Sequence, residues 1–440
     1  MLLCVCVNFY RSVTYSINKI INSYNETLEF ISSNLRHSKG LGGGKKERGE
    51  VFTPVALIDS MFSAAESFCP DLWTNPHRRF LDPCAGIGNF SLIAFHKLMN
   101  GLPISDAQAR KRHILGKMLI MVEIDSTNAN ECRKAFGPQA QIYNEDFLIG
   151  ALGGSLGGAG GRQGLFDVIF GNPPYQKQVG TTKTVQIWPA FVEKSLSLLK
   201  SDGLLIFVHP PGWRNIEGIF KKTQKLLTQN SLRCLSIHNE QDGLDVFLSS
   251  TRFDWYVLSK TSENLLTDVR FQDNQKLKLN LRCLDFLPNA NYSEIMQMIA
   301  KDGPKDGPKA TILYDSSTFD SRKLSKVQTE DFHLPVVYTV NSKDEPSILW
   351  ASNSASKHNQ SKLIWSNGSK PGSLIDADGH FGLSQFAYAI IDEPSVLPAI
   401  KKAFDSPKFR HLMEMCTFGQ GHINYKILAT WRKNWYLDFV

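Results

Sequence analysis

Short apolar runs and amphipathic segments alternate along the first 260 residues. The apolar runs are typical of buried strands, which we expect at 79–82, 117–122, 141–143, 166–170 and 203–208. Between them, apolar residues recur at helical spacing, so helices are expected from Pro54 onward, with Thr53 as N-cap, and at 91–99, 128–136 and 187–199. This alternation predicts an α/β fold of the Rossmann-like, doubly wound class, with parallel strands and helices on both faces.

The pattern changes after about residue 260. Short strand-like runs such as 334–340 then alternate with loops, and one helix is expected at 396–415. The 440 residues therefore divide into an N-terminal helical segment and flexible loop at 1–44, the α/β domain at 45–260 and a mixed α+β domain at 261–440.

The composition excludes a disordered chain and leaves the partner open. Of the residues, 42% are hydrophobic, which is enough to bury a large core. Lys and Arg number 49 and Asp and Glu 42, so the formal net charge is +7. Residues 1–260 hold 28 basic and 22 acidic side chains, a small and scattered excess. Such a charge permits a nucleic-acid partner without demanding one.

The cysteines and the start of the chain give no sign of a metal site or of export. The eight cysteines are scattered, and none has a Cys or His partner at zinc spacing, so we expect buried thiols in a reducing compartment. The apolar segment 1–7 is short and lacks a basic leader. No apolar run approaches the roughly 18 residues of a membrane span. We expect a cytoplasmic protein that is not secreted and binds no metal.

Candidate chemistry lies where the expected strands end. The segment Asp82-Pro83-Cys84-Ala85-Gly86-Ile87-Gly88 reads as strand, turn and helix start, the ligand end of a doubly wound fold. Gly86 and Gly88 let the backbone approach a ligand where a Cβ would clash. Glu123 follows the next strand, where a carboxylate suits ribose hydroxyls, and Asp125 is an alternative. A tight turn and two solvated acids would explain these features equally well.

Two further motifs follow the next strands. Asp146-Phe147 places an acid that can accept from an adenine amino group beside an aromatic ring. Asn172-Pro173-Pro174-Tyr175 follows the strand at 166–170, and its prolines stiffen the loop. The Asn172 side-chain oxygen and the Pro173 carbonyl can both accept from one amino group, while Tyr175 offers a face for stacking. Of the four motifs, this loop is the most specific indication of function.

Together the motifs resemble those of the S-adenosylmethionine-dependent N6-adenine DNA methyltransferases, of the NPPY type found in restriction–modification systems. Glu50-Val51-Phe52-Thr53-Pro54 is similar to the upstream motif that closes over the methionine end of the cofactor, and 208–213 lies where the family carries a loop beside the target base. The resemblance covers about residues 45–260. It implies catalytic roles for Asn172, Pro173, Pro174 and Tyr175, and cofactor contacts for Phe52, Thr53, Pro54, Asp82, Pro83, Ala85, Gly86, Gly88, Glu123, Ile124, Asp146, Phe147 and Asn172.

The resemblance also implies a mechanism and a partner. An adenine flipped out of double-stranded DNA would stack on Tyr175 and present its amino group to Asn172 and the Pro173 carbonyl. The amino nitrogen would then attack the methyl group of S-adenosylmethionine in line. The host implied is prokaryotic or viral.

Other substrates remain open, because the same motif occurs in RNA methyltransferases and in glutamine methyltransferases that act on release factors. N4-cytosine in DNA is a further alternative. Three features favour adenine in DNA: the upstream motif precedes the glycine motif, about 180 residues follow the catalytic domain, and Asn precedes the two prolines. Retention of the site residues disfavours an inactive binding module. Only about 50 residues precede the cofactor region, so a cognate restriction endonuclease would be a separate chain.

The second domain is expected to recognise the target. Segments 362–367 and 419–426 mix basic, amide and aromatic residues that suit base edges and phosphates, although turns in a small β-rich domain explain them equally well. Trp431 and Trp435 are expected in the core. The glycine-rich segment 150–164 lacks the Gly-Lys-Ser/Thr ending of a phosphate loop and is expected to be a surface insertion.

Overall fold

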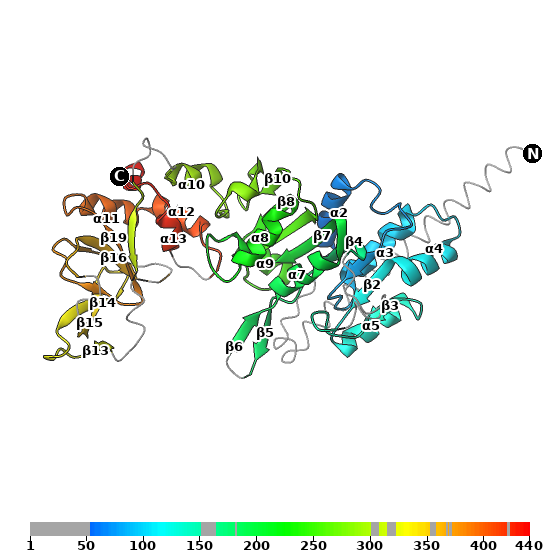
Figure 1. Cartoon of the computed structure of the whole chain (residues 1–440), viewed down its shortest axis with the longest axis horizontal. Coiled ribbons are helices and arrows are strands. Elements are labelled where there is room, and N and C mark those ends of the chain that lie inside the picture. The colour runs from blue at the N-terminus through cyan, green and yellow to red at the C-terminus, as the bar shows by residue number, and fades with distance from the viewer. Residues whose placement is uncertain are drawn as a thin grey trace, which may run out of the picture. The chain divides into compact units, whose positions relative to one another are not determined.

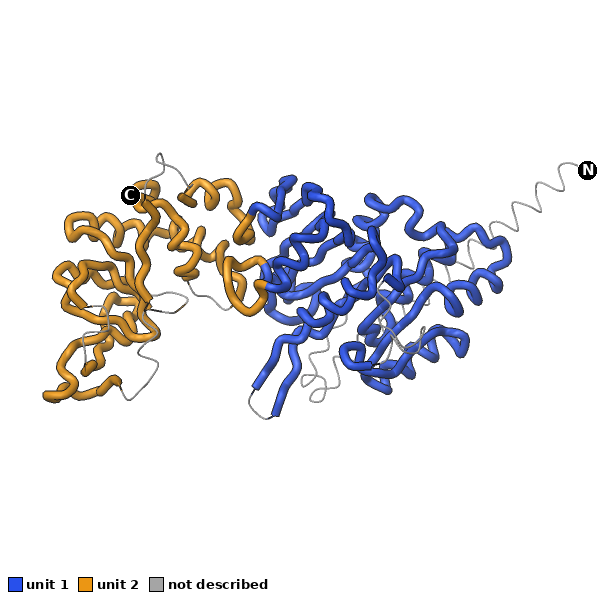
Figure 2. The backbone as a smooth tube through the Cα atoms, in the orientation of Figure 1, with its two compact units in different colours: residues 1–213, 222–283 blue, residues 214–221, 284–440 orange. Residues whose placement is uncertain are grey.

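The computed structural model describes residues 53–150, 164–180, 183–300, 308–314, 323–352, 358–366, 368, 372–419 and 423–440. Several predicted features lie outside these ranges: the segment at 1–44, Glu50 to Phe52, most of the glycine-rich insertion, Asn367, and 420–422. The chain forms two compact units, which Figure 2 draws in different colours. Unit 1 comprises residues 1–213 and 222–283, and unit 2 comprises residues 214–221 and 284–440.

Unit 1 is built on a nine-stranded mixed sheet (Figure 1) with the order β11-β10-β8-β9-β7-β4-β1-β2-β3. Strands β3, β2, β1, β4 and β7 are parallel neighbours, and β9 runs antiparallel between β7 and β8. From β1 the chain adds β2 and β3 on one side and then β4 and β7 on the other, so the strand order reverses between β1 and β4. The predicted doubly wound fold is thereby confirmed. The strands are β1 (Phe80–Asp82), β2 (Leu119–Val122), β3 (Gln141–Tyr143), β4 (Phe166–Gly171), β7 (Leu199–His209), β8 (Ser231–His238), β9 (Phe253–Ser259), β10 (Thr267–Arg270) and β11 (Lys276–Leu279).

Helices connect most of these strands, as the alternation predicts. Buried apolar residues of α2 and α3 pack with those of β1, β4 and β7 in one core. None of the helices in the described ranges is long and apolar enough to cross a membrane. The helices are α2 (Val55–Phe68), α3 (Asn89–Gly101), α4 (Ala107–His113), α5 (Ser126–Phe136), α7 (Trp188–Leu198), α8 (Lys221–Gln229) and α9 (Glu240–Phe247), with shorter turns at η1 (Ile114–Met118), η2 (Pro211–Arg214) and η3 (Leu281–Cys283).

Two local predictions in unit 1 are wrong. Thr53 is not the N-cap of α2, because the helix begins at Val55 with Pro54 in the cap position and no side-chain cap hydrogen bond. The Thr53 hydroxyl accepts instead from the side chain of Asn172. Residues 117–118 end the π-helical turn η1, so strand β2 is shorter than the apolar run suggests.

The sheet of unit 1 extends past residue 260, where the sequence predicts the domain boundary. β10 pairs in parallel with β8, and β11 pairs antiparallel with β10, so 267–279 belongs to the sheet. Residues 214–221 belong instead to unit 2. Within that unit Arg214 is fully buried, and its guanidinium donates to the Leu287 carbonyl at 2.8 Å. The role of unit 2 in target recognition stays a prediction.

Unit 2 has the mixed α+β architecture that the sequence predicts. Its two four-stranded sheets have the orders β12-β19-β16-β17 and β13-β15-β14-β18. Their strands are β12 (Thr311–Tyr314), β13 (Leu324–Ser325), β14 (Leu334–Val340), β15 (Pro346–Ala351), β16 (Lys362–Ser366), β17 (Ser373–Asp376), β18 (Gly382–Leu383) and β19 (Ala387–Ile391). The helices are α10 (Tyr292–Met298), α11 (Leu397–Asp405), α12 (Pro407–Met415) and α13 (Tyr425–Leu428), followed by the turn η7 (Trp435–Asp438).

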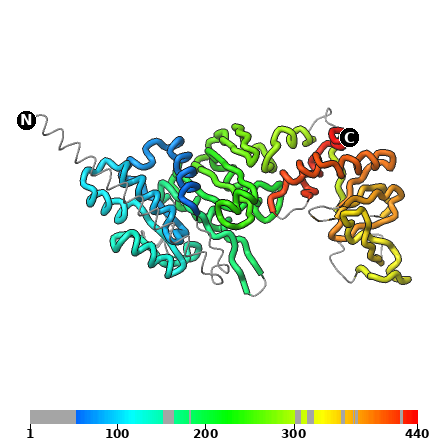
Figure 3. Tube along the Cα trace, turned by 180° about the vertical axis from the view of Figure 1, so that it is seen from behind, coloured from blue at the N-terminus to red at the C-terminus, as the bar shows by residue number. Residues whose placement is uncertain are grey.

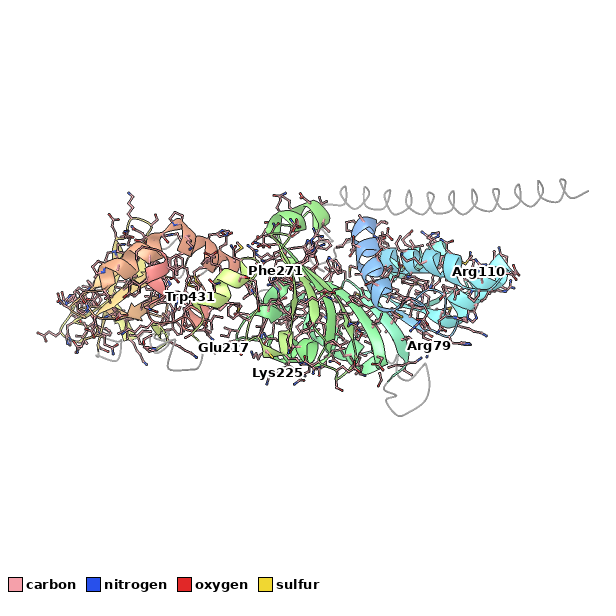
Figure 4. All side chains as sticks on the ribbon, turned by 90° about the horizontal axis from the view of Figure 1, so that it is seen from above. Arg79, Arg110, Glu217, Lys225, Phe271 and Trp431 are labelled. Atoms are coloured by element: carbon pink, nitrogen blue, oxygen red, sulfur yellow. The ribbon has the colours of Figure 1, made fainter. Side chains whose placement is uncertain are left out.

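The single helix predicted at 396–415 is in fact the two helices α11 and α12. Pro407 has no N–H group to continue α11, and Ser406 caps α12 by accepting from the Phe409 amide at 3.2 Å. Trp431, labelled in Figure 4, and Trp435 are fully buried in the core cluster that contains these helices. Their predicted core placement is confirmed.

The first candidate recognition segment of unit 2 lies in its core. All of β16 is buried, and Lys362 Nζ pairs with Asp376 Oδ2 at 2.7 Å. Burial lowers the pKa of Lys362. In the second segment, Asn424 caps α13 and Lys426 pairs with Glu217. The described parts of both segments therefore have structural roles, which is the alternative that the sequence left open.

Candidate functional site

A cavity of about 1050 Å³ lies at the carboxyl ends of β1, β2, β3 and β4. This is the edge of a doubly wound sheet where ligands bind. Of the predicted site residues, the cavity is lined by Thr53, Pro83, Ala85, Gly86, Glu123, Ile124, Asp146, Phe147, Asn172, Pro173, Pro174 and Tyr175. Pro54, Asp82 and Gly88 do not line it, and Phe52 lies outside the described residues.

The two glycines of the glycine motif, Asp82 to Gly88, have different roles. Gly86 lines the cavity, where its small size allows close approach of a ligand. Gly88 precedes α3 with a φ of 93°, and a Cβ there would lie 3.1 Å from Phe136 Cε2 and 3.3 Å from Cys132 Sγ. Gly88 is therefore required for backbone conformation and for packing against α5, whereas the sequence suggested a ligand contact.

Glu123 holds the glycine turn to the end of the second strand. Its Oε2 accepts from the Gly86 amide at 2.7 Å, and its Oε1 accepts from the Asp125 amide at 2.8 Å. The side chain lines the cavity although only 6% of the residue is exposed. Asp125 instead caps α5 by accepting from the amides of Thr127 and Asn128. Of the two acids that the sequence offered, Glu123 is the one in the cavity.

Asp82 does not line the cavity and instead holds the elements beside it together. Its Oδ2 accepts from Ser91 Oγ at 2.8 Å, and the carboxyl is almost fully buried. Burial raises the pKa of Asp82 to about 7, and the negative charge of Glu123 adds to this rise. The carboxyl therefore ties β1 to α3, with no surface on the cavity.

The raised pKa of Asp82 predicts a pH-dependent stability. Between pH 4 and pH 7 the native carboxyl keeps a proton that the unfolded chain has lost, so the free energy of unfolding should fall as pH rises through this window. Asp82→Asn, which keeps the shape but cannot ionise, should remove this part of the pH dependence. Urea unfolding of both proteins at pH 5 and pH 8 measures the difference. Equal pH dependence in the two proteins would contradict the burial argument.

The Phe147 ring is packed against other side chains and is almost fully buried. Its ring stacks on Phe191 with the centroids 5.3 Å apart, Lys194 Nζ lies 5.0 Å from its centroid, and only 2% of the residue is exposed. The neighbouring Asp146 accepts from the Leu148 amide at 2.8 Å through Oδ1. Both residues line the cavity, so the Asp146-Phe147 motif lies at the sheet edge where the sequence predicts it.

The Asn-Pro-Pro-Tyr loop packs closely against the glycine motif. A Cβ at Gly171 would lie 3.3 Å from Cys84 Sγ and 3.4 Å from Asp82 Oδ1, so the position before Asn172 has little room for a side chain. Asn172 Nδ2 donates to Thr53 Oγ1 at 3.1 Å. Because the amide nitrogen is used in this way, the amide oxygen is the end of Asn172 that would accept from a substrate amino group.

Tyr175 completes the loop as a half-buried residue on the cavity wall. Its carbonyl accepts from the Ile187 amide at 3.1 Å, which ties the end of the loop to the start of α7. Burial raises the pKa of the Tyr175 hydroxyl, so this group stays neutral across the physiological range. The ring can therefore offer an uncharged face to a planar group.

Asn89, which the sequence motifs do not indicate, joins the upstream motif to the glycine turn. It lines the cavity, and its Nδ2 donates to the Thr53 carbonyl at 3.0 Å. Only 4% of Asn89 is exposed, and its Oδ1 has no hydrogen-bond partner among the described residues. Its position directly after Gly88, at the first turn of a helix, is the signal that could have identified it. Other lining residues that were missed include Asn128, Glu145, Ile187 and Phe191.

The segment 208–213 does not line the cavity, although the resemblance places it beside the target base. His209 is fully buried, stacks on Trp188 at 4.0 Å between centroids, and contacts the Tyr256 hydroxyl through Nε2 at 3.1 Å. Burial lowers the pKa of His209 to about 3, so its ring is neutral. Trp213 Nε1 donates to Asp254 at 3.0 Å. These contacts give the segment a structural role.

Known proteins match the part of the chain that forms this site. Residues 90–247 match the family described as Eco57I restriction-modification methylase. The modification methylase CviBIII of Paramecium bursaria Chlorella virus NC1A is 22% identical over 46% of this chain and 38% of its own length. The predicted resemblance to restriction–modification methylases is confirmed. A type II methyltransferase of Thermus thermophilus is 28% identical over 38% of this chain and 35% of its own length.

A third methylase relative matches a shorter segment. The uncharacterised adenine-specific methylase of Mycoplasma pneumoniae is 37% identical over 17% of this chain and 18% of its own length. The chain thus covers at most 38% of any of these three relatives. The methylase family match at 90–247 includes Glu123, Asp146 and the Asn172 loop, whereas Asp82 to Gly88 precede it.

Proposed function

We propose that this chain is a DNA methyltransferase that transfers the methyl group of S-adenosylmethionine to the N6 amino group of adenine. One observation carries the proposal: the Glu123 carboxylate and the Asn172-Pro173-Pro174-Tyr175 loop line the same cavity. In this proposal Glu123 would bind the ribose of the cofactor, beside the loop that would hold a planar amino group. The restriction–modification character of the relatives supports DNA as the polymer.

The residues present fit the proposed cofactor. Gly86 leaves room beside the glycine turn, and two backbone amides hold the Glu123 carboxylate in place on the cavity wall, where a carboxylate suits ribose hydroxyls. The buried Oδ1 of Asn89 has no hydrogen-bond partner among the described residues, so it suits the ammonium group of a methionine moiety. The cavity, at about 1050 Å³, is large enough for the cofactor and a planar base.

The proposed mechanism needs no nucleophile from the protein. S-Adenosylmethionine would supply an electrophilic methyl group on its sulfonium. Asn172 Oδ1 and the Pro173 carbonyl would accept from the adenine amino group, orient its nitrogen and draw its lone pair out of conjugation with the ring. Tyr175 would hold the flipped base by stacking. The contribution of these residues is therefore orientation and proximity.

The choice of adenine rests on Asn172 and on one relative that is described as adenine-specific. The alternatives are N4 of cytosine in DNA, RNA, and a protein glutamine, because each presents a planar amino or amide group to the same acceptors. Double-stranded DNA is the proposed partner. A cognate restriction endonuclease, as a separate chain, belongs to the same proposal.

A transfer assay with three polymers tests the substrate. The DNA substrate is amplified in vitro from genomic DNA, so it carries no methylation and offers many different sequences. Tritium from labelled S-adenosylmethionine should enter this DNA. Total RNA and a protein extract, offered in parallel, should remain unlabelled. Tritium in protein or RNA alone would overturn the DNA proposal.

A further inference from the structure

A β-hairpin directly follows the Asn-Pro-Pro-Tyr loop. Its strands are β5 (Gln176–Val179) and β6 (Lys183–Gln186), which pair only with each other among the described strands. Every residue of both strands is exposed, and Figures 1 and 3 show the hairpin projecting from unit 1. Gln176, Lys177 and Gln178 line the cavity. The hairpin therefore stands at the mouth of the proposed active site.

The pairing register gives the hairpin two chemically different faces. Lys177 lies opposite Val185, and Val179 lies opposite Lys183. Paired residues and residues two apart share a face, so one face carries two lysines and two valines. The other face carries amide and hydroxyl groups, from Gln176, Gln178, Thr184 and Gln186.

The hairpin carries two lysines and no acidic residue. No Asp or Glu occurs from 168 to 192, and neither Lys177 nor Lys183 pairs with a carboxylate among the described residues. Other lysines of unit 1 do pair: Lys200 Nζ lies 2.8 Å from Asp167, and Lys222 Nζ lies 2.6 Å from Glu193. Among the described residues, therefore, no carboxylate neutralises the two hairpin lysines, and an anionic ligand could do so.

The two valines of the hairpin leave apolar surface exposed to solvent. Val179 is 51% exposed and Val185 is 37% exposed, on the face that carries the lysines. An isolated two-stranded hairpin is marginally stable in water, because it buries little apolar surface. A partner that contacts this face would both order the hairpin and neutralise its charge.

We propose that the hairpin is an arm that grips the DNA strand on either side of the flipped adenine. Lys177 and Lys183 contact backbone phosphates, and the amide face lies within reach of neighbouring base edges. A polynucleotide fits better than a protein partner because phosphates repeat along the strand that must enter this cavity. The inference rests on the proposed function and adds to it the element that holds the strand at the cavity mouth.

Salt-dependent DNA binding tests the arm. The variant Lys177→Gln/Lys183→Gln removes two charges, and Lys276→Gln/Lys278→Gln removes two lysines from β11, the far edge strand of the same sheet. The dissociation constant of a fluorescent mixed-sequence duplex is measured by anisotropy at several salt concentrations. Each phosphate interaction that is removed should lower the slope of log K against log salt by about 1. The slope should therefore fall by about 2 in the hairpin variant and stay unchanged in the β11 variant.

Two controls separate the arm from the proposed function. Affinity for S-adenosylhomocysteine, measured by calorimetry, should be the same in all three proteins, since Glu123 and the glycine turn, which we propose hold the cofactor, are unchanged. If the wild type methylates DNA but the hairpin variant has the same salt slope as the wild type, the proposal of a DNA-binding arm is wrong and the proposed function stands. An equal reduction in both variants would overturn the arm too. A wild type that neither binds nor methylates DNA would overturn the proposed function itself.

Discussion

Replacing Asn172 by Ala should lower the rate of methyl transfer by about 100- to 1000-fold, the range found when one oriented polar group is removed from a reacting centre. Alanine removes the side-chain oxygen that would accept from the amino group, and the Pro173 carbonyl alone would not fix the nitrogen. Affinity for the cofactor should stay nearly unchanged, because Glu123 and the glycine turn are untouched. Single-turnover transfer to DNA measures the rate, and calorimetry with S-adenosylhomocysteine measures the affinity.

Asn130→Ala is a matched control for this decrease. Asn130 is an exposed residue of α5 whose side chain contacts Arg133 and does not line the cavity. Its variant should transfer at the wild-type rate, and both variants should keep the wild-type melting temperature within a few degrees. Undiminished transfer by Asn172→Ala would contradict the catalytic assignment.

Glu123→Gln should weaken cofactor binding by about 10- to 100-fold, because a charge-assisted hydrogen bond contributes about 1.5–3 kcal/mol. Both Glu123 oxygens accept from backbone amides, Gly86 at 2.7 Å and Asp125 at 2.8 Å. The glutamine side chain replaces one oxygen with an NH2 group, which would then face a backbone N–H and repel it. The glycine turn would loosen, and ribose hydroxyls would lose an anionic acceptor.

Asp125→Asn is the control for the second acid. Asn caps helices about as well as Asp does, so α5 should keep its N-terminus. We expect cofactor affinity close to that of the wild type, measured by the same calorimetric titration. A larger decrease in Asp125→Asn than in Glu123→Gln would mean that the ribose carboxylate has been assigned to the wrong residue.

The sequence predicts the central sheet and the position of the site well, because both follow from local pattern. Buried strands such as β2 are continuous apolar runs, and in a parallel sheet the residues that follow neighbouring strands meet at one edge. Glu123, Asp146 and Asn172 are therefore brought together by topology alone. The chemical types of these residues then indicate what the edge could bind.

Long-range contacts explain what the sequence did not reveal. Thr53 looked like a helix cap, but its hydroxyl meets Asn172, 119 positions further along the chain. Gly88 looked like a ligand contact, but its space is limited by Phe136 and Cys132 of α5. The final strands of the sheet, β10 and β11, are short and carry no long apolar run, so only their pairing with β8 assigns them to unit 1.

The identity of the methylated nucleoside tests the central proposal most directly. DNA from the transfer reaction is digested to nucleosides and analysed by mass spectrometry, with Asn172→Ala as the matched inactive control. We expect N6-methyldeoxyadenosine in the wild-type reaction and almost none in the control. N4-methyldeoxycytidine in its place, or DNA without any methylated nucleoside beside labelled RNA or protein, would contradict it.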